Sequence, residues 1–177
     1  IFGVRHPGQS GRADGLREIL AVHRLAAFLE TCIRQEKRLA ERICLETERY
    51  IAIAPFAASS PFETWILPTE HRHDFALSSD EDLRGLAVIL RDFLRRARTL
   101  LNDPPYNLVL HTVPNPHPRP GRPDFWTTIE YDYHWHFEFA PRTTLPAGFE
   151  WGSGYSINPM PPEEAARLLS DADPDQE

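Results

Sequence analysis

The chain is poor in cysteine, and this shortage removes one familiar kind of metal site. Its 177 residues contain two cysteines, Cys32 and Cys44, which lie too far apart in the sequence to form a CxxC metal clip. We interpret them as reduced thiols of a cytoplasmic protein, because structural disulfides are rare in that compartment. A disulfide between the two is the alternative.

Long apolar runs and excess positive charge are also missing. No apolar run approaches the ~20 residues that a membrane-spanning helix needs, and the first residues lack the basic-then-apolar pattern of a signal peptide. The chain has 19 Lys and Arg against 26 Asp and Glu, a net charge of −7. We therefore expect no membrane and no nucleic acid as partners. Anionic small molecules are not excluded, because a local site can be positive in an acidic protein.

The length and the 41% apolar content are enough for one domain with a core. The first residue is Ile1 rather than Met, as expected for a fragment of a longer protein. We divide the chain into an N-terminal loop and helix (1–41), a main domain (42–172) and an acidic tail (173–177).

The spacing of apolar residues predicts three helices and several strands. The helices are expected at 16–38, from the capping and acidic stretch 78–82 to about Leu101, and at 162–170. Strands are expected at 61–68 and 106–113, while 42–55 reads as one long strand or a strand pair and 148–158 as a Gly-rich strand or turn. Because loops as well as helices join the strands, we predict an α+β fold whose antiparallel sheet is flanked by two long helices.

The most informative segment, 130–139, alternates without a break. In a β-strand, successive side chains point to opposite faces. A strand here would place five aromatic residues on one face and an ionisable row on the other, namely Glu130, Asp132, His134, His136 and Glu138. The aromatic face would pack on the core, and the two histidines of the ionisable face would reach one metal ion or one phosphate. The alternative is a half-buried strand whose wet face simply carries histidine.

Four segments in order resemble the galactose-1-phosphate uridylyltransferase family, a branch of the histidine-triad superfamily. They are APFA and PFETWILP with His71 (54–71), PYNLVLH (105–111), HWH to Pro-Arg (134–142), and AGFEWGSG with INP and PEEAA (147–166). The resemblance covers 42–170 and is to the C-terminal half of such enzymes, which have two similar half-domains. It implies a histidine-triad-like half-domain in the 42–172 region.

The resemblance implies a nucleotidyltransferase that moves a nucleoside monophosphate between a nucleotide sugar and a hexose 1-phosphate, through a nucleotidyl-histidine and as a homodimer. A histidine nucleophile divides one displacement into two easier steps. The family nucleophile is the second histidine of a His-Pro-His motif, but the similar string here, His6-Pro7-Gly8, has glycine at that position. The alternative is a non-catalytic half-domain that binds metal and sugar phosphate or dimerises.

The resemblance also implies one structural metal ion, zinc or iron, which imidazole and carboxylate ligands suit. One branch of the family uses histidines that match His111, His134 and His136 with a helix glutamate, for which Glu18 is the nearest candidate. Another branch uses a CxxC pair with histidines that match His71 and His134. Without a CxxC, this chain fits the histidine-rich branch better.

The expected hexose phosphate contacts are Phe149 and Glu150, which match the family segment that holds this group. Asn107 is a further candidate, with a turn residue as its alternative interpretation. No catalytic residue follows from the family motif. A histidine-triad hydrolase would use His136 as its nucleophile, but the third histidine of that triad falls at Glu138, which argues against it.

Overall fold

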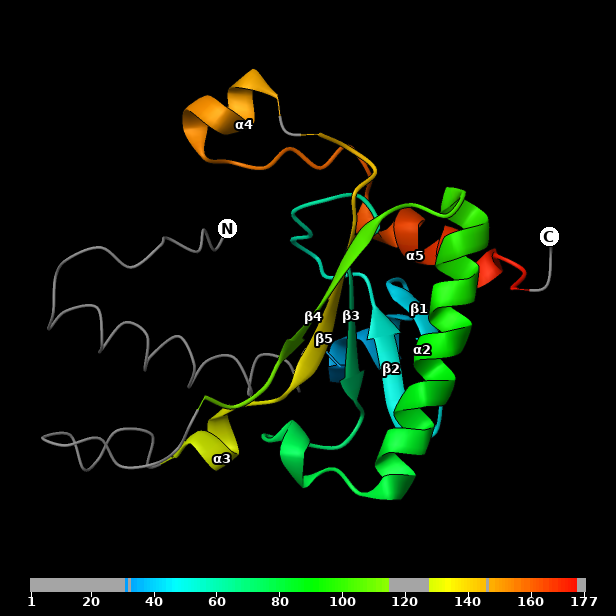
Figure 1. Ribbon diagram of the computed structural model, residues 1–177, viewed down its shortest axis with the longest axis vertical. Helices are drawn as coiled ribbons and strands as arrows, with labels where there is room; N and C mark the ends of the chain where they lie inside the picture. Colours follow the sequence, from blue (N-terminus) through cyan, green and yellow to red (C-terminus); the bar gives the residue numbers. More distant parts are fainter. Residues whose placement is uncertain (1–30, 32, 115–127, 146, 175–177) are drawn as a thin grey trace, which may run out of the picture.

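The computed structural model describes residues 31, 33–114, 128–145 and 147–174. They form an α+β fold around a five-stranded antiparallel sheet, as expected from the sequence (Figure 1). The strand order is β1-β2-β3-β5-β4, with β1 at Ile43–Glu46, β2 at Tyr50–Ile53, β3 at Thr64–Pro68, β4 at Tyr106–His111 and β5 at His136–Pro141.

The register of the strands fixes which side chains share a face. His111 on β4 lies opposite His136 on β5, and Trp65 on β3 lies opposite Glu138. Directly paired residues on neighbouring strands point to the same face. One face of the sheet therefore gathers two histidines, a glutamate and a tryptophan.

The opposite face holds the main core under α2 (Asp80–Leu101), which lies alongside the sheet in Figure 1. Ser79 caps this helix in a reciprocal pair with Asp82. Phe93 is fully buried and meets Phe139 of β5 edge to face, with ring centroids 5.0 Å apart. The helix α5 (Pro162–Asp171) completes this layer, with Ala165, Ala166 and Leu169 in the same core.

A second, smaller apolar cluster lies on the histidine-bearing face. Ile33, from a helical segment at 33–39, packs with Ile51, Ile53 and Leu67 of β2 and β3. Successive side chains of β2 point to opposite faces of the sheet. Ile51 and Ile53 therefore lie on the histidine-bearing face, whereas Ala52 between them belongs to the main core. Helices thus contact both faces of the sheet.

Most expected elements are confirmed with shifted ends. Of the two interpretations of 42–55, the strand pair is correct, and the helix expected at 162–170 is α5. The first long helix is confirmed only for residues 33–39, since its expected start lies outside the described residues.

Two expectations are wrong. The segment 130–139 is not one strand, because Ile129–Asp132 forms a helical turn, α3, and β5 begins only at His136. The ladder between β4 and β5 ends at the pair His111–His136, so the residues that precede His136 have no partner on β4. The Gly-rich segment expected as strand or turn contains the short helix α4 at Gly148–Ser153.

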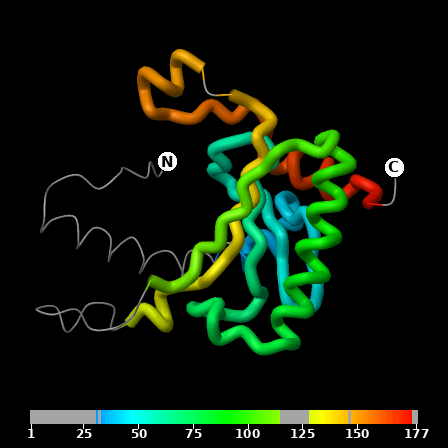
Figure 2. The backbone as a smooth tube through the Cα atoms, in the orientation of Figure 1, coloured from blue at the N-terminus to red at the C-terminus, as the bar shows by residue number. Residues whose placement is uncertain are grey.

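Residues 147–157, called the arm below, include α4 and stand away from the sheet (Figure 2). A 3-10 turn, η1 at Phe75–Leu77, precedes α2. Within the described part of the chain, every helix is too short or too polar to cross a membrane.

Candidate functional site

His134 lies two residues before β5 and has no exposed surface, which contradicts the alternative of a wet face that simply carries histidine. Its Nε2 is 3.0 Å from the carbonyl oxygen of Pro68. A carbonyl only accepts, so Nε2 carries the proton and Nδ1 has the lone pair. Nδ1 is buried and has no hydrogen-bond partner among the described residues. The pKa of His134 is lowered to about 4, mainly by burial and secondly by the nearby His71, so its ring is neutral.

The ring of His71 approaches that of His134 edge to face, with centroids 5.5 Å apart and planes at 80°. His71 follows β3, and its Nε2 donates to the carbonyl oxygen of Glu130 at 2.8 Å. This bond ties the turn α3 to the segment after β3. Because Glu130 and Asp132 belong to this turn and not to β5, they are not part of the ionisable row that the sequence predicts.

His136 belongs to a second group of side chains. Its ring stacks on His111, with centroids 4.9 Å apart and planes at 19°, and contacts Trp65 on its other neighbour strand, at 5.4 Å. Its Nδ1 donates to the carbonyl oxygen of His134 at 3.2 Å, which leaves the Nε2 lone pair unprotonated. Burial lowers the pKa of His136 to about 4.

Glu138 completes this group. Its Oε2 is 3.1 Å from Nε2 of His111, and this hydrogen bond lowers the pKa of Glu138. The ionised carboxylate accepts, so His111 carries the proton on Nε2. The sequence predicts His111 as a metal ligand, but it indicates neither a role for Trp65 nor the pairing of His111 with Glu138. Both depend on the register of β3 and β4 against β5, which no local pattern reveals.

Four of the five described histidines form two pairs, His71 with His134 and His111 with His136. In the part of the chain that the structure describes, no three His, Cys, Asp or Glu side chains are grouped to hold a metal ion. The buried lone pair on His134 Nδ1 is the feature that best suits a metal ligand. The described residues thus have the right chemistry for part of a zinc or iron site and do not supply a complete set of ligands.

The remaining expected ligand, Glu18, lies outside the described residues, as do Cys32 and the His6-Pro7-Gly8 string. Cys44 is a free thiol, 2% exposed. Burial raises its pKa to about 12, which keeps it protonated and a poor metal ligand.

The expected sugar phosphate residues lie on the arm. Phe149 is 58% exposed, and the exposed Trp151 and Tyr155 accompany it. The Oε2 atom of Glu150 accepts a hydrogen bond at 3.0 Å from the backbone N–H of Ala147, the N-cap residue of α4. One oxygen of this carboxylate is thus fixed by the backbone, which sets the direction of the other.

Asn107, the third expected substrate residue, is exposed on β4 opposite Ala140 of β5. It therefore lies within a strand rather than in the turn that its alternative interpretation requires. No described contact joins it to Phe149 or Glu150.

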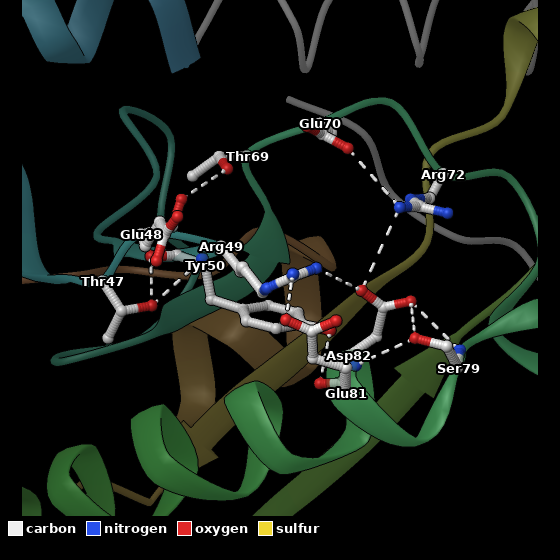
Figure 3. Close-up of polar contacts among 10 residues, drawn as sticks. All are labelled: Thr47, Glu48, Arg49, Tyr50, Thr69, Glu70, Arg72, Ser79, Glu81 and Asp82. Carbon is white, nitrogen blue, oxygen red and sulfur yellow. Dashed lines mark hydrogen bonds and ion pairs between the residues drawn. The ribbon is translucent and has the colours of Figure 1, made fainter.

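A hollow of about 330 Å³ lies between the end of β3 and the start of α2, and the loop of His71 borders it. Figure 3 shows its charges in a network: Arg49 pairs with Glu81 and, at 3.1 Å, with Asp82, while Arg72 lies 3.4 Å from Glu70. Because these arginines already contact carboxylates, the hollow offers no concentrated positive charge for a phosphate. We interpret the network as a structural link between β2 and α2.

Known proteins resemble this chain both in sequence and in fold. Residues 17–143 match the family model for the galactose-1-phosphate uridyl transferase C-terminal domain. The ADP-glucose phosphorylase of Arabidopsis thaliana is 32% identical over 166 residues, which cover 92% of this chain and 42% of that protein. The galactose-1-phosphate uridylyltransferase of Haemophilus influenzae is 33% identical over 109 residues, or 61% of this chain and 31% of that protein.

Solved structures give the same result. The crystal structure of the Arabidopsis ADP-glucose phosphorylase with bound ADP-glucose superimposes with a TM-score of 0.68 at 32% identity, over 80% of this chain and 43% of that one. A uridylyltransferase structure gives 0.67 at 25% identity, over 89% and 49%. The chain therefore spans less than half the length of these relatives. It belongs to the galactose-1-phosphate uridylyltransferase family and matches that family's C-terminal domain.

Proposed function

We propose that this chain is the C-terminal half of a nucleotidyltransferase that moves a nucleoside monophosphate between a nucleotide sugar and a hexose 1-phosphate. The proposed intermediate is a nucleotidyl-histidine, formed on a histidine outside the described residues. The family match supports this reaction class, and the names of the relatives support nucleotide sugars and sugar phosphates as substrates. In this account, the half-domain supplies contacts to the sugar phosphate.

The observation that carries the proposal is the placement of Glu150. Its carboxylate is anchored through Oε2 on an exposed arm, where the preceding residue, Phe149, also exposes its aromatic side chain. A carboxylate that accepts hydroxyl hydrogen bonds next to an aromatic ring is a common way to hold a sugar. Fixing one oxygen in advance reduces the ordering cost of binding. Asn107 is proposed as a further polar contact.

We further propose a structural zinc or iron ion. His134 is its best-placed ligand, with His71, His111 and His136 as partners and Glu18 as the carboxylate. Such an ion would fix the segments before β5 and after β3 relative to each other. The residues described here hold no complete set, so no catalytic step is assigned to the metal.

The proposal includes a homodimer in the cytoplasm. The arm's large exposed apolar side chains, Phe149, Trp151, Tyr155 and Ile157, are a surface that a second subunit would cover. A reduced Cys44 thiol is compatible with that compartment. The alternative function is a non-catalytic half-domain that binds metal and sugar phosphate or dimerises, since no family nucleophile lies in the described residues.

Calorimetric titration of the chain with glucose 1-phosphate, galactose 1-phosphate, UDP-glucose and ADP-glucose tests the substrate class. The key variant is Glu150→Gln, because the amide oxygen of glutamine can still accept from the backbone N–H of Ala147 while the negative charge is removed. We expect hexose 1-phosphate affinity to fall by about tenfold or more, the effect of losing a hydrogen bond to a charged group. Glu70→Gln, at an exposed residue away from the arm, is the matched control. Equal affinity of Glu150→Gln and the parent chain would remove the arm from the sugar phosphate site.

A further inference from the structure

The arm returns to the body of the domain at Asn158, whose side chain bridges two segments. Its Nδ2 donates to the carbonyl oxygens of Ala58 and Ser60, both at 3.2 Å. Its Oδ1 accepts from the backbone N–H of Met160 at 3.0 Å. Both N–H groups of the amide are thus used on one loop, and its oxygen turns the chain toward α5.

The loop that receives Asn158 is itself held firmly. The carboxylate of Glu63, 5% exposed, accepts from both the backbone N–H and the hydroxyl of Ser59, each at 2.7 Å. The backbone N–H of Ala58 donates to Pro55 at 3.1 Å. Phe62 has a φ of +60°, a conformation that a bulky residue keeps only when its surroundings enforce it. The two carbonyls that accept from Asn158 are therefore fixed relative to β3, which follows this loop directly.

The arm, in contrast, is stabilised largely by its own short-range bonds. The hydroxyl of Ser153 donates to the carbonyl oxygen of Phe149 at 2.7 Å and accepts from the backbone N–H of Tyr155 at 3.2 Å. Glu150 closes the first turn through Ala147. These bonds join residues within the arm, so they fix its internal shape but not its orientation relative to the sheet. Figure 2 shows the arm projecting away from the sheet.

We propose that Asn158 is a positioning residue, which fastens the arm to the 58–60 loop and thereby sets where Phe149 and Glu150 stand relative to the sheet. The importance of those two residues rests on the function proposed above, whereas the fastening itself does not. The amide is specifically required. An aspartate would keep the bond from Met160 but would place negative charge against two carbonyl oxygens, which repel it.

The position of the arm can be measured by double electron–electron resonance between spin labels at Gly152→Cys and Val88→Cys, in a Cys32→Ser background. A side chain added at Gly152 meets no atom within 4 Å, Val88 on α2 is 44% exposed, and Cys44 is buried. We expect Asn158→Asp to shift and broaden the distance distribution. Gln35→Glu makes the same amide-to-acid change at an exposed helical residue and should leave the distribution as in the parent.

The same variants are titrated with galactose 1-phosphate and glucose 1-phosphate. We expect Asn158→Asp to lower the affinity at least tenfold, while Gln35→Glu does not change it. If Asn158→Asp does not fold, Asn158→Ala, which removes the donors without adding charge, gives the same two readouts. An unchanged distance distribution in the folded variant overturns the proposal, even if affinity falls. A broadened distribution with no sugar phosphate binding by the parent chain supports the fastening and contradicts the proposed function.

Discussion

The half-buried His71 and the buried His134 meet edge to face, although one follows β3 and the other precedes β5. Pro68 accepts the Nε2 proton of His134, and this hydrogen bond directs the buried Nδ1 lone pair of the same ring away from Pro68. A buried histidine that serves only the core usually satisfies both ring nitrogens. The orphan nitrogen of His134 is the strongest structural argument for the proposed metal ion.

Replacement of His134 by alanine is therefore expected to abolish metal binding. Loss of a ligand lowers zinc or iron content, as measured by inductively coupled plasma mass spectrometry on protein purified in parallel with the parent. His73→Ala is the control, since His73 is a neighbouring histidine without an assigned role. Equal metal content in His134→Ala and the parent, or a metal-free parent, would contradict the metal proposal.

Removal of the Phe93 ring is expected to cause a large loss of stability. The side chain is fully buried and packs edge to face on Phe139. Phe93→Ala should lower the free energy of unfolding by about 3–5 kcal/mol, the usual cost of such a cavity. Urea denaturation followed by circular dichroism measures this value, and a loss below about 1 kcal/mol would mean that α2 does not pack on β5 as described.

Arg96 on α2 stabilises the end of α5. Its Nη1 donates to the carbonyl oxygens of Ser170 at 2.5 Å and Ala172 at 2.8 Å. These carbonyls lack helical partners, so a guanidinium there acts as a C-terminal cap. We expect Arg96→Ala to lower the free energy of unfolding by about 1–2 kcal/mol. Arg84→Ala, at a residue 77% exposed on the same helix, should change it by less than about 0.5 kcal/mol.

Asp82 should make the stability depend on pH in the acid range. Hydrogen bonds from the side chain and backbone of Ser79, with a smaller effect of the arginines, hold the pKa of Asp82 below its usual value. A carboxyl with a lower pKa in the folded state stabilises the fold above its unfolded pKa of about 4. That contribution is lost as the pH falls through the folded pKa. Thermal unfolding from pH 7 to pH 2 should show a smaller acid-induced fall in Tm for Asp82→Asn than for the parent. Parallel curves would contradict this role.

The local sequence predicts α2 well because all its signals agree. The Ser79 cap, the acidic first turn and the apolar spacing up to Leu101 come from residues near one another in the sequence. The family resemblance likewise depends on short motifs that the sequence displays directly. No longer-range information is needed for either.

The histidine site was harder to predict. Alternation from Glu130 to Phe139 places side chains on faces, but whether a face is covered depends on distant segments such as Pro68 and His71. His134 and His136 are consequently buried rather than solvated. Their pairing with His71 and His111 follows from strand order and register, which no periodic pattern within one segment contains.

The proposed nucleotidyl transfer is tested by intact-mass spectrometry of the protein encoded by the full reading frame, and of this chain alone. Each is incubated with UDP-glucose and, separately, with ADP-glucose, and hexose 1-phosphate is then added. We expect the full protein to gain one nucleoside monophosphate from one donor and to lose it to the hexose 1-phosphate, and this chain alone to gain none. A folded full protein with no adduct from either donor would contradict the proposed nucleotidyl transfer. An adduct on this chain would instead show a competent nucleophile within it.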